Sequence, residues 1–216
     1  MLVIFKCRYL HRHSKIAPCC VRHDIRKEFR LMRILAISGS LKAASSNTSL
    51  VRAASRLAPE SVEIIVYAGL ADLPHFNPDL DDLDKEIAPL PVAHFRRQLR
   101  ASDGVLISSP EYAHGVPGVL KNALDWLVGS GETVGKPFAL INASPLATHA
   151  QESLTEILTT MAANIVAEAS IRIPLAHRKL DESGIVSDPE ISGLLRASIV
   201  ALVRAIEDSR AEAEDV

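Results

Sequence analysis

Small hydroxylated residues crowd the segment Ser38–Thr48, which reads SGSLKAASSNT and stands between an apolar run and a helical pattern. The first-turn N–H groups of a helix lack intrahelical partners and the helix dipole favours negative charge, so such a turn can bind an anion. Lys42 adds a positive charge. The segment contains neither GK[ST] nor G-x-G-x-x-G, so it is not a Walker A loop or a dinucleotide-binding fingerprint. A small loop rich in hydroxyl groups suits a single phosphate group, as on a mononucleotide. The structural alternative is that Ser46 or Asn47 only caps the helix and the other serines are solvated.

The elements that would position this segment alternate along the chain from Arg33 onward. Helical patterns such as Val116–Leu127, with Pro117 near its start and Gly129 past its end, separate short apolar runs. Apolar runs without alternation are typical of parallel strands covered on both faces. They occupy Arg33–Ser38, Val62–Tyr67, Gly104–Ser109, Pro137–Ala143 and a shorter stretch near Ile165–Ala169. We therefore predict an α/β doubly wound parallel sheet, with its chemistry in the loops after strands one, three and four.

The loop and helix after the third predicted strand, Ser108–Trp126, read SSPEYAHGVPGVLKNALDW. GS-L-K-x-x-S-x-N after strand one, followed by SPEY-x-x-G-x-PG-x-LKNALDW after strand three, resembles the NAD(P)H-dependent FMN reductase family. Relatives of that family include chromate- and quinone-reducing flavoproteins and some azoreductases. The resemblance covers about Met32 to the fifth strand. It implies a flavodoxin-like, five-stranded parallel sheet of order 2-1-3-4-5 with helices on both faces.

The resemblance also implies which residues contact FMN. The phosphate would be held by Ser40, Lys42, Ser45, Ser46 and Asn47. The isoalloxazine ring would be wrapped, largely by backbone groups, by Pro110, Glu111, Tyr112, Ala113 and Gly115, and contacted by Ser144 and Pro145 after the fourth strand. No catalytic side chain and no metal ligand are expected, because the N5 atom of the flavin carries the chemistry.

The chain departs from the family pattern at two of these positions. Lys42 stands where the family commonly has Arg, so the charge is kept but the planar bidentate fork is lost. Ala113 stands where the family often has Asn, so we expect a side-chain amide contact to the flavin pyrimidine edge to be missing.

The physical chemistry of the second loop also suits a flavin. Backbone amides in a rigid turn can donate near N1, O2 and N5 of the anionic reduced ring, and Gly115 lets a backbone approach a flat ring closely. Tyr112 offers an amphipathic surface beside the ring, or simply packs in the loop. We expect the backbone of Glu111 to matter more than its carboxylate. His114 could donate a proton to a reduced quinone, but a solvated loop histidine is the favoured interpretation.

Other polar residues are expected to be structural. On the predicted helix these are Lys121, Asn122, Asp125 and Trp126, which we assign to packing or an interface. In the long loop Leu73–Pro91, Asn77 and Asp79 are expected to fix turns, whereas Phe76 could approach the flavin of a neighbouring subunit.

The activity that the resemblance implies is a ping-pong reductase reaction. NADPH or NADH would reduce bound FMN, and a quinone, free flavin, azo compound or oxidised metal species would then take the electrons. Homodimers or homotetramers are implied, with Val116–Val128 as an interface candidate. Two alternatives stay open: an FMN electron carrier of the flavodoxin type without its own NAD(P)H oxidation, and a flavin-binding regulatory protein.

Charge and cysteine usage divide the chain near residue 31. Residues 1–31 hold eight of the 24 basic residues, two of the 26 acidic residues and all three cysteines, and the remainder has a net charge of −8. We predict a basic extension over 1–31, poorly ordered or a mis-assigned start, a reductase domain over 32–210 and an acidic tail over 211–216. A targeting arm or a metal site at Cys19, Cys20 and His23 is the alternative role of the extension, although adjacent cysteines do not match usual zinc spacing. Neither nucleic acid nor a membrane is an expected partner, and a cytoplasmic location is expected.

Overall fold

The computed structural model describes residues 31–214, except 84–86, 145, 176–177 and 179. Its described residues belong to a compact unit that begins at Leu31. The predictions for the basic extension, including the Cys19, Cys20 and His23 alternative, therefore lie outside the described residues.

Five parallel strands form one sheet in the order β2-β1-β3-β4-β5. This order confirms the prediction. The strands are β1 (Met32–Ser38), β2 (Val62–Tyr67), β3 (Gly104–Ser108), β4 (Pro137–Ile141) and β5 (Asn164–Ile165). Every residue of β3 and β4 is buried, as expected for strands covered on both faces.

The fifth strand is shorter than predicted, because β5 ends at Ile165 and a 3-10 turn spans Ala167–Ala169. Pairing with β4 resumes after the turn, where Arg172 bridges Asn142. Between the two paired stretches, the backbone N–H of Leu140 donates to Ser170 Oγ over 3.1 Å. The prediction of one strand over Ile165–Ala169 was wrong because a short apolar run does not distinguish a strand from a turn that also buries apolar side chains.

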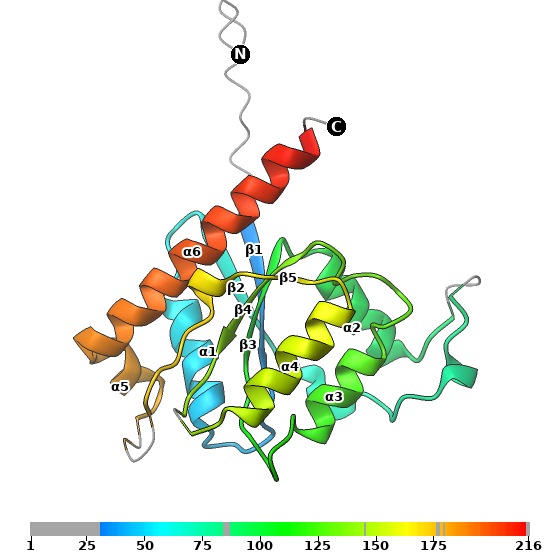
Figure 1. Ribbon diagram of the computed structural model, residues 1–216, viewed down its shortest axis with the longest axis horizontal. Helices are drawn as coiled ribbons and strands as arrows, with labels where there is room; N and C mark the ends of the chain where they lie inside the picture. The colour runs from blue at the N-terminus through cyan, green and yellow to red at the C-terminus, as the bar shows by residue number, and fades with distance from the viewer. Residues whose placement is uncertain (1–30, 84–86, 145, 176–177, 179, 215–216) are drawn as a thin grey trace, which may run out of the picture. The chain divides into compact units, whose positions relative to one another are not determined.

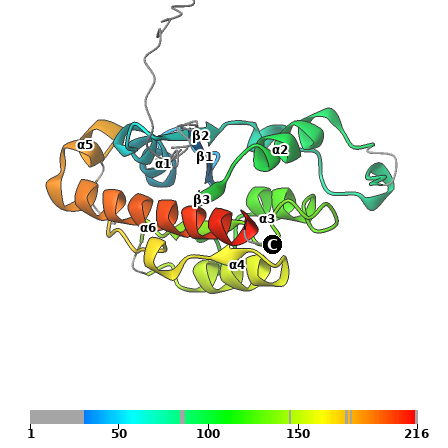
Figure 2. The same cartoon turned by 90° about the horizontal axis from the view of Figure 1, so that it is seen from above.

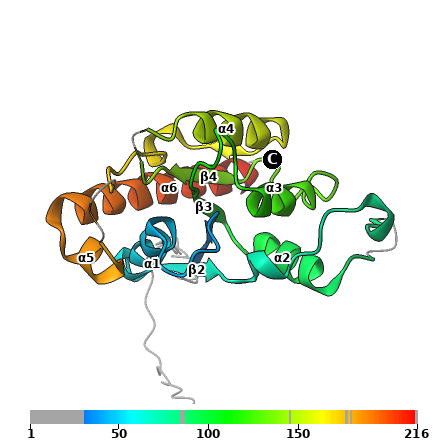
Figure 3. The same ribbon diagram turned by 90° about the horizontal axis from the view of Figure 1, so that it is seen from below.

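Six helices in the described residues cover the sheet in two layers (Figure 1). One layer consists of α1 (Ser46–Leu57), α5 (Glu182–Ser187) and α6 (Pro189–Glu214), and the other of α2 (Leu90–Arg100), α3 (Gly118–Asp125) and α4 (His149–Thr160). Side chains alternate between the layers: Ile34 and Ala36 of β1 face the first, and Leu35 and Ile37 face the second. Both layers are also distinct when viewed along the strands, from either end (Figures 2 and 3).

The last helix, α6, lies diagonally on one face of the sheet, and its end reaches the amino ends of the strands (Figure 1). Ile206 packs against Gly104 at the start of β3, and Arg210 pairs with Asp103 over 2.7 Å. The helix continues through Glu214, so residues 211–214 of the expected tail are helical. Within the described residues, no helix is both long enough and apolar enough to cross a membrane.

The long loop between β2 and α2 is anchored to α2 and α3 by buried polar contacts. Arg96 donates two hydrogen bonds of 2.7 Å to the Asp81 carboxylate and a third, from Nε, to the carbonyl of Trp126. Trp126 Nε1 and Asn122 Nδ2 both donate to the carbonyl of Pro74. Asn77 Oδ1 accepts from the N–H of Asp79, as expected of a residue that fixes a turn.

Candidate functional site

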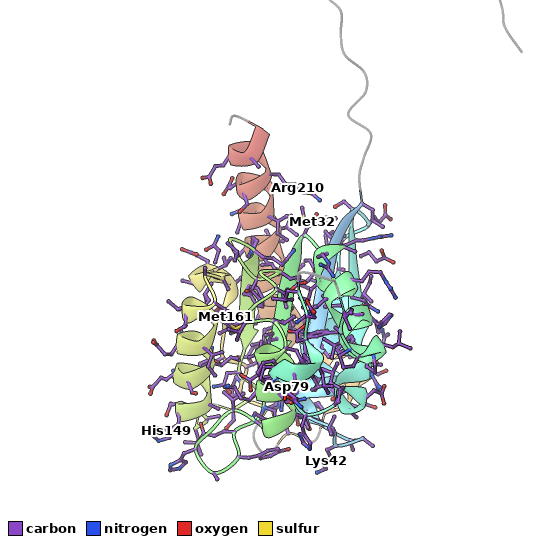
Figure 4. All side chains as sticks on the ribbon, turned by 90° about the vertical axis from the view of Figure 1, so that its right-hand side faces the viewer. Met32, Lys42, Asp79, His149, Met161 and Arg210 are labelled. Atoms are coloured by element: carbon purple, nitrogen blue, oxygen red, sulfur yellow. The ribbon has the colours of Figure 1, made fainter. Side chains whose placement is uncertain are left out.

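The two loops that the sequence singled out lie side by side at the carboxyl ends of β1 and β3. The N–H of Gly39 donates to the carbonyl of Ser108 over 2.8 Å, and Ser108 Oγ donates to Asn47 Oδ1 over 2.9 Å. A Cβ on Gly39 would stand 2.6 Å from Ser109 Oγ, so a larger residue there would have to displace the Ser109 side chain. Figure 4 shows Lys42 at the same end of the sheet as His149, with Met32 at the opposite end.

The first turn of α1 is open to an anion. Ser45 is the N-cap residue, but no side chain caps the helix and no acidic residue lies in its first turn. Neighbouring hydroxyls instead hold the preceding turn together: Ser38 Oγ lies 2.9 Å from Thr48 Oγ1, and Ser40 Oγ accepts from the N–H of Lys42. The first-turn N–H groups are therefore left for a ligand. The capping alternative for Ser46 and Asn47 is not what the structure has.

A crevice of about 620 Å³ extends from this turn over the ends of β3 and β4. Among the predicted site residues, those that line it are Ser46, Asn47, Pro110, Glu111 and Ser144. The crevice is also lined by residues that the sequence did not single out, which are Ser109, Asn142, Ala143, Leu146, Ala147, Leu175 and Arg178.

The other predicted site residues lie around this crevice. Ser40 is buried within the turn, and Ser45 and Lys42 line a second cavity of about 750 Å³ beside α1 and the start of α5. Pro145 lies outside the described residues. Tyr112, Ala113 and Gly115 follow the crevice-lining Glu111 in a hairpin.

This hairpin is a tight two-residue turn. Tyr112 and Gly115 exchange backbone hydrogen bonds of 3.2 and 3.0 Å, while Ala113 and His114 between them have φ angles of 50° and 61°. Two successive positive φ angles are the geometry of a primed hairpin turn. The His114 ring stacks on that of His149, at the start of α4, with ring centroids 4.3 Å apart. The turn is therefore held against α4.

Comparison with known proteins agrees with this arrangement. The model of the NADPH-dependent FMN reductase family matches residues 32–178. The chain belongs to this family. An NAD(P)H-dependent FMN reductase of Pseudomonas aeruginosa is 32% identical over 79% of this chain and 93% of its own length. An Escherichia coli quinone reductase is 32% identical over 73% of this chain and 86% of its own.

Solved structures place the reductase in the flavodoxin-like fold. FerB, a flavoenzyme NAD(P)H:acceptor oxidoreductase from Paracoccus denitrificans, has a TM-score of 0.66 and 30% identity, covering 82% of this chain and 98% of its own. A flavodoxin from Pseudomonas aeruginosa shares the fold at 14% identity, with a TM-score of 0.53 over 80% of this chain and 99% of its own. The chain is an oxidoreductase with FMN as its cofactor and NAD(P)H as its electron donor.

The residues of this reductase fit FMN. The uncapped first turn of α1 supplies N–H donors for a phosphate dianion, and the crevice leads from it to the loops after β3 and β4. Its lining combines apolar side chains, such as Leu146 and Leu175, with polar groups such as Asn142 and Ser144. The apolar side chains can contact a flat ring, and the polar groups can orient it and bind a phosphate.

Glu111 connects the loop after β3 to α4 through its side chain. Its Oε2 accepts from the N–H of Ala150, in the first turn of α4, over 2.8 Å. A carboxylate at a helix N-terminus satisfies an unpaired donor and interacts favourably with the helix dipole. The carboxylate therefore has a structural role, in addition to the backbone contacts expected at this position.

Of the crevice residues that were not predicted, Asn142 could have been found from its position in the sequence, whereas Arg178 could not. Asn142 shapes the third loop, since its Oδ1 accepts from the N–H of Ser144 and its Nδ2 donates to the carbonyl of Ala147. It comes directly after β4, where the strand-end rule could have found it. Arg178 lies in an irregular stretch beyond β5, and no local pattern points to it.

Proposed function

We propose that this reductase passes electrons from NAD(P)H to small acceptors in two successive half-reactions at one crevice. FMN, when bound, supplies the chemistry by taking a hydride from NAD(P)H and returning electrons to the acceptor. The observation that carries the proposal is the continuity of one crevice from the uncapped turn of α1 to the loops after β3 and β4.

Each loop has a separate task in this proposal. The first-turn N–H groups of α1 bind the FMN phosphate, and the loop Ser109–Glu111 positions the ring. The Tyr112–Gly115 hairpin and its stack on α4 keep that loop rigid, so its backbone donors need no rearrangement as charge develops on the ring. Pro145 would contribute a further contact beside Ser144.

Quinones and other flat, oxidised molecules are the acceptors we propose. Tyr112 and Leu146, which are 56% and 80% exposed, offer open apolar surface near the crevice against which a flat ring can lie. The E. coli relative is named a quinone reductase, and FerB is described as an NAD(P)H:acceptor oxidoreductase. A site open to solvent supports a broad acceptor range, extending to free flavins, azo compounds and oxidised metal species.

We also propose that the active species is a homodimer. Exposed apolar side chains gather in the long loop, at the start of α2 and at the end of α3, and they are Phe76, Leu80, Leu83, Ile87, Leu90 and Val128. Leu90 is 86% exposed, and exposed apolar side chains concentrated in neighbouring segments favour an interface. Leu90→Glu should give a monomer by light scattering, whereas Val200→Glu, on α6, should not. A wild-type monomer would contradict the proposal, and a tetramer would require a second interface.

The test of the reductase proposal combines spectroscopy with kinetics. Purified protein reconstituted with FMN should lose its visible flavin absorbance on anaerobic addition of NADPH or NADH, and regain it on addition of a quinone. Initial rates at several quinone concentrations should give parallel double-reciprocal lines, as a ping-pong reaction requires. Intersecting lines would overturn the two-step scheme, and the absence of bleaching would favour an electron carrier. A cytoplasmic location stays a prediction.

A further inference from the structure

Arg178 is the one cationic residue among the described residues that line the FMN crevice. It shares that lining with Ser46 and Asn47, the first two residues of α1. Lys42, the cation of the phosphate turn, lines the neighbouring cavity with Arg52 instead. A phosphate bound to the first turn of α1 from the crevice side would therefore share that surface with Arg178.

The guanidinium of Arg178 is oriented by the start of α6. Its Nη2 donates to Asp188 Oδ2 over 2.6 Å. The other carboxylate oxygen of Asp188 accepts from the N–H groups of Glu190 and Ile191, each over 3.1 Å. The hydrogen bond from the Ile191 backbone, more than any other contact, lowers the pKa of Asp188, so this carboxylate is charged at neutral pH.

Most of the donors of Arg178 are left for a ligand. A guanidinium has five N–H groups in a planar fork, and Asp188 is its one assigned acceptor among the described residues. The side chain is 48% exposed, whereas that of Asp188 is 15% exposed and does not line the crevice. Asp188 thus holds one edge of the fork and leaves the rest accessible.

We propose that Arg178 binds a phosphomonoester in the crevice, and that this group is the 5′-phosphate of FMN. Arginine suits a phosphate because parallel N–H donors contact two oxygens at once. The shared lining with Ser46 and Asn47 favours the FMN phosphate, since the helix N-terminus supplies the remaining donors. The 2′-phosphate of NADPH has the same chemistry, so the test must separate the two. The assignment rests on FMN occupying this crevice.

The test is a titration of the full-length apoprotein with FMN and, separately, with riboflavin, followed by flavin fluorescence or absorbance. Arg178→Ala should raise the Kd for FMN about tenfold to a hundredfold, the effect of losing a charge-assisted bidentate contact. The Kd for riboflavin, which lacks the phosphate, should change less than twofold. Arg178→Lys should fall between wild type and Arg178→Ala, because it keeps the charge without the fork.

Two further variants separate contact from positioning. Asp188→Asn still accepts from the helix N–H groups but weakens the ion pair, so it should raise the Kd for FMN less than Arg178→Ala does. Arg204→Ala removes an exposed cation of α6 outside the crevice and should leave both Kd values unchanged. Thermal unfolding of each apoprotein checks that the variants fold.

Three outcomes of these experiments are informative. If Arg178→Ala weakens the binding of FMN and riboflavin equally, or weakens neither, the assignment of Arg178 to the FMN phosphate is wrong. A rise in the KM for NADPH but not for NADH, measured at saturating FMN with unchanged FMN affinity, would transfer the contact to the 2′-phosphate. If the bound FMN of wild type and of every variant were not bleached by NAD(P)H, the proposed function would be wrong. The FMN titration would still test the role of Arg178, because it measures binding and not turnover.

Discussion

At the scale of single residues, the loop after β3 has an unusual backbone. Ala113 and His114 both adopt positive φ angles, at 50° and 61°, in a turn where glycine or asparagine is favoured. Each such L-residue costs about 1–2 kcal/mol relative to ordinary backbone. The turn is maintained by the hydrogen bonds between Tyr112 and Gly115 and by the His114–His149 stack. Strain of this kind is typical of ligand-binding turns that must be rigid.

Replacing Ala113 with glycine should stabilise the protein. The substitution removes about 1–2 kcal/mol of backbone strain from the folded state. Glycine also gives the unfolded chain more conformational freedom, which costs roughly 0.4–1 kcal/mol of stability, so we expect the free energy of unfolding to rise by about 0.5–1 kcal/mol. Urea unfolding of the apoprotein measures it. Ala71→Gly is the matched control, because Ala71 is exposed and has no positive φ, and it should not stabilise. A loss of stability in Ala113→Gly would contradict the role assigned to φ.

At the scale of elements, side chains distant in sequence connect the loops to the helices that support them. The Glu111 carboxylate reaches the first turn of α4, and Arg96 of α2 ties the long loop to the end of α3. Neither contact repeats with the period of a helix or strand. Loops of a parallel sheet gain a defined shape only when such contacts satisfy their polar groups.

Removing the Glu111 carboxylate should weaken the junction between the loop after β3 and α4. Glu111→Ala leaves the N–H of Ala150 without this acceptor and should cost about 0.5–2 kcal/mol, as the loss of a helix cap does. Glu111→Gln keeps an acceptor oxygen and should cost less. Glu156→Ala removes an exposed carboxylate from the same helix and should stay within about 0.5 kcal/mol of wild type. Equal losses in Glu111→Ala and Glu156→Ala would show that the contact has no special role.

The buried Arg96–Asp81 pair should show strong coupling. The two side chains are 5% and 9% exposed, so Arg96→Met or Asp81→Asn alone leaves a buried partner unsatisfied and should cost about 3–5 kcal/mol. The double variant should cost clearly less than the two single losses together, because neither charge is then left alone. Chemical denaturation of all four proteins completes the cycle. Additive losses would mean that the pair does not act as a unit.

At the scale of the whole molecule, α6 spans one face of the sheet and its end reaches the start of β3, while the crevice occupies the carboxyl end. Ile206 fits against Gly104, where an added Cβ would stand 2.6 Å from Ile206 Cδ1. The first residues of the same helix lie beside Asp188, which orients Arg178 in the crevice. One helix therefore packs against the start of β3 near its own end and, at its beginning, lies beside the carboxylate that orients Arg178.

The packing of α6 against the start of β3 can be tested by adding a methyl group at Gly104 and removing one from Ile206. Gly104→Ala should destabilise by about 1–3 kcal/mol through overpacking. Ile206→Val removes the Cδ1 atom and alone should cost about 0.5–1.5 kcal/mol. In the double variant the new Cβ occupies the vacated space, so its thermal stability should exceed that of Gly104→Ala. A double variant less stable than Gly104→Ala would place the clash elsewhere.

The amino-acid sequence by itself determined the parallel sheet, the two helical layers and the two loops that face the crevice, and its resemblance to the reductase family implied the strand order. The sheet, the layers and the loops depend on local patterns: apolar runs bounded by turn residues, and long motifs directly after β1 and β3. Buried runs such as Gly104–Ser108 needed no information from distant residues. The break after β5 escaped prediction because the 3-10 turn there buries the same kind of residue as a strand.

Only the tertiary structure decided which side chains meet in the crevice and what each one does. Glu111 caps a helix 39 residues further along the chain, and Arg178 enters the crevice with Asp188 beside it. Lys42, prominent in the motif, lines the neighbouring cavity. The physical reason is that loop side chains are placed by hydrogen bonds and packing between segments distant in sequence, and no periodic pattern encodes such contacts.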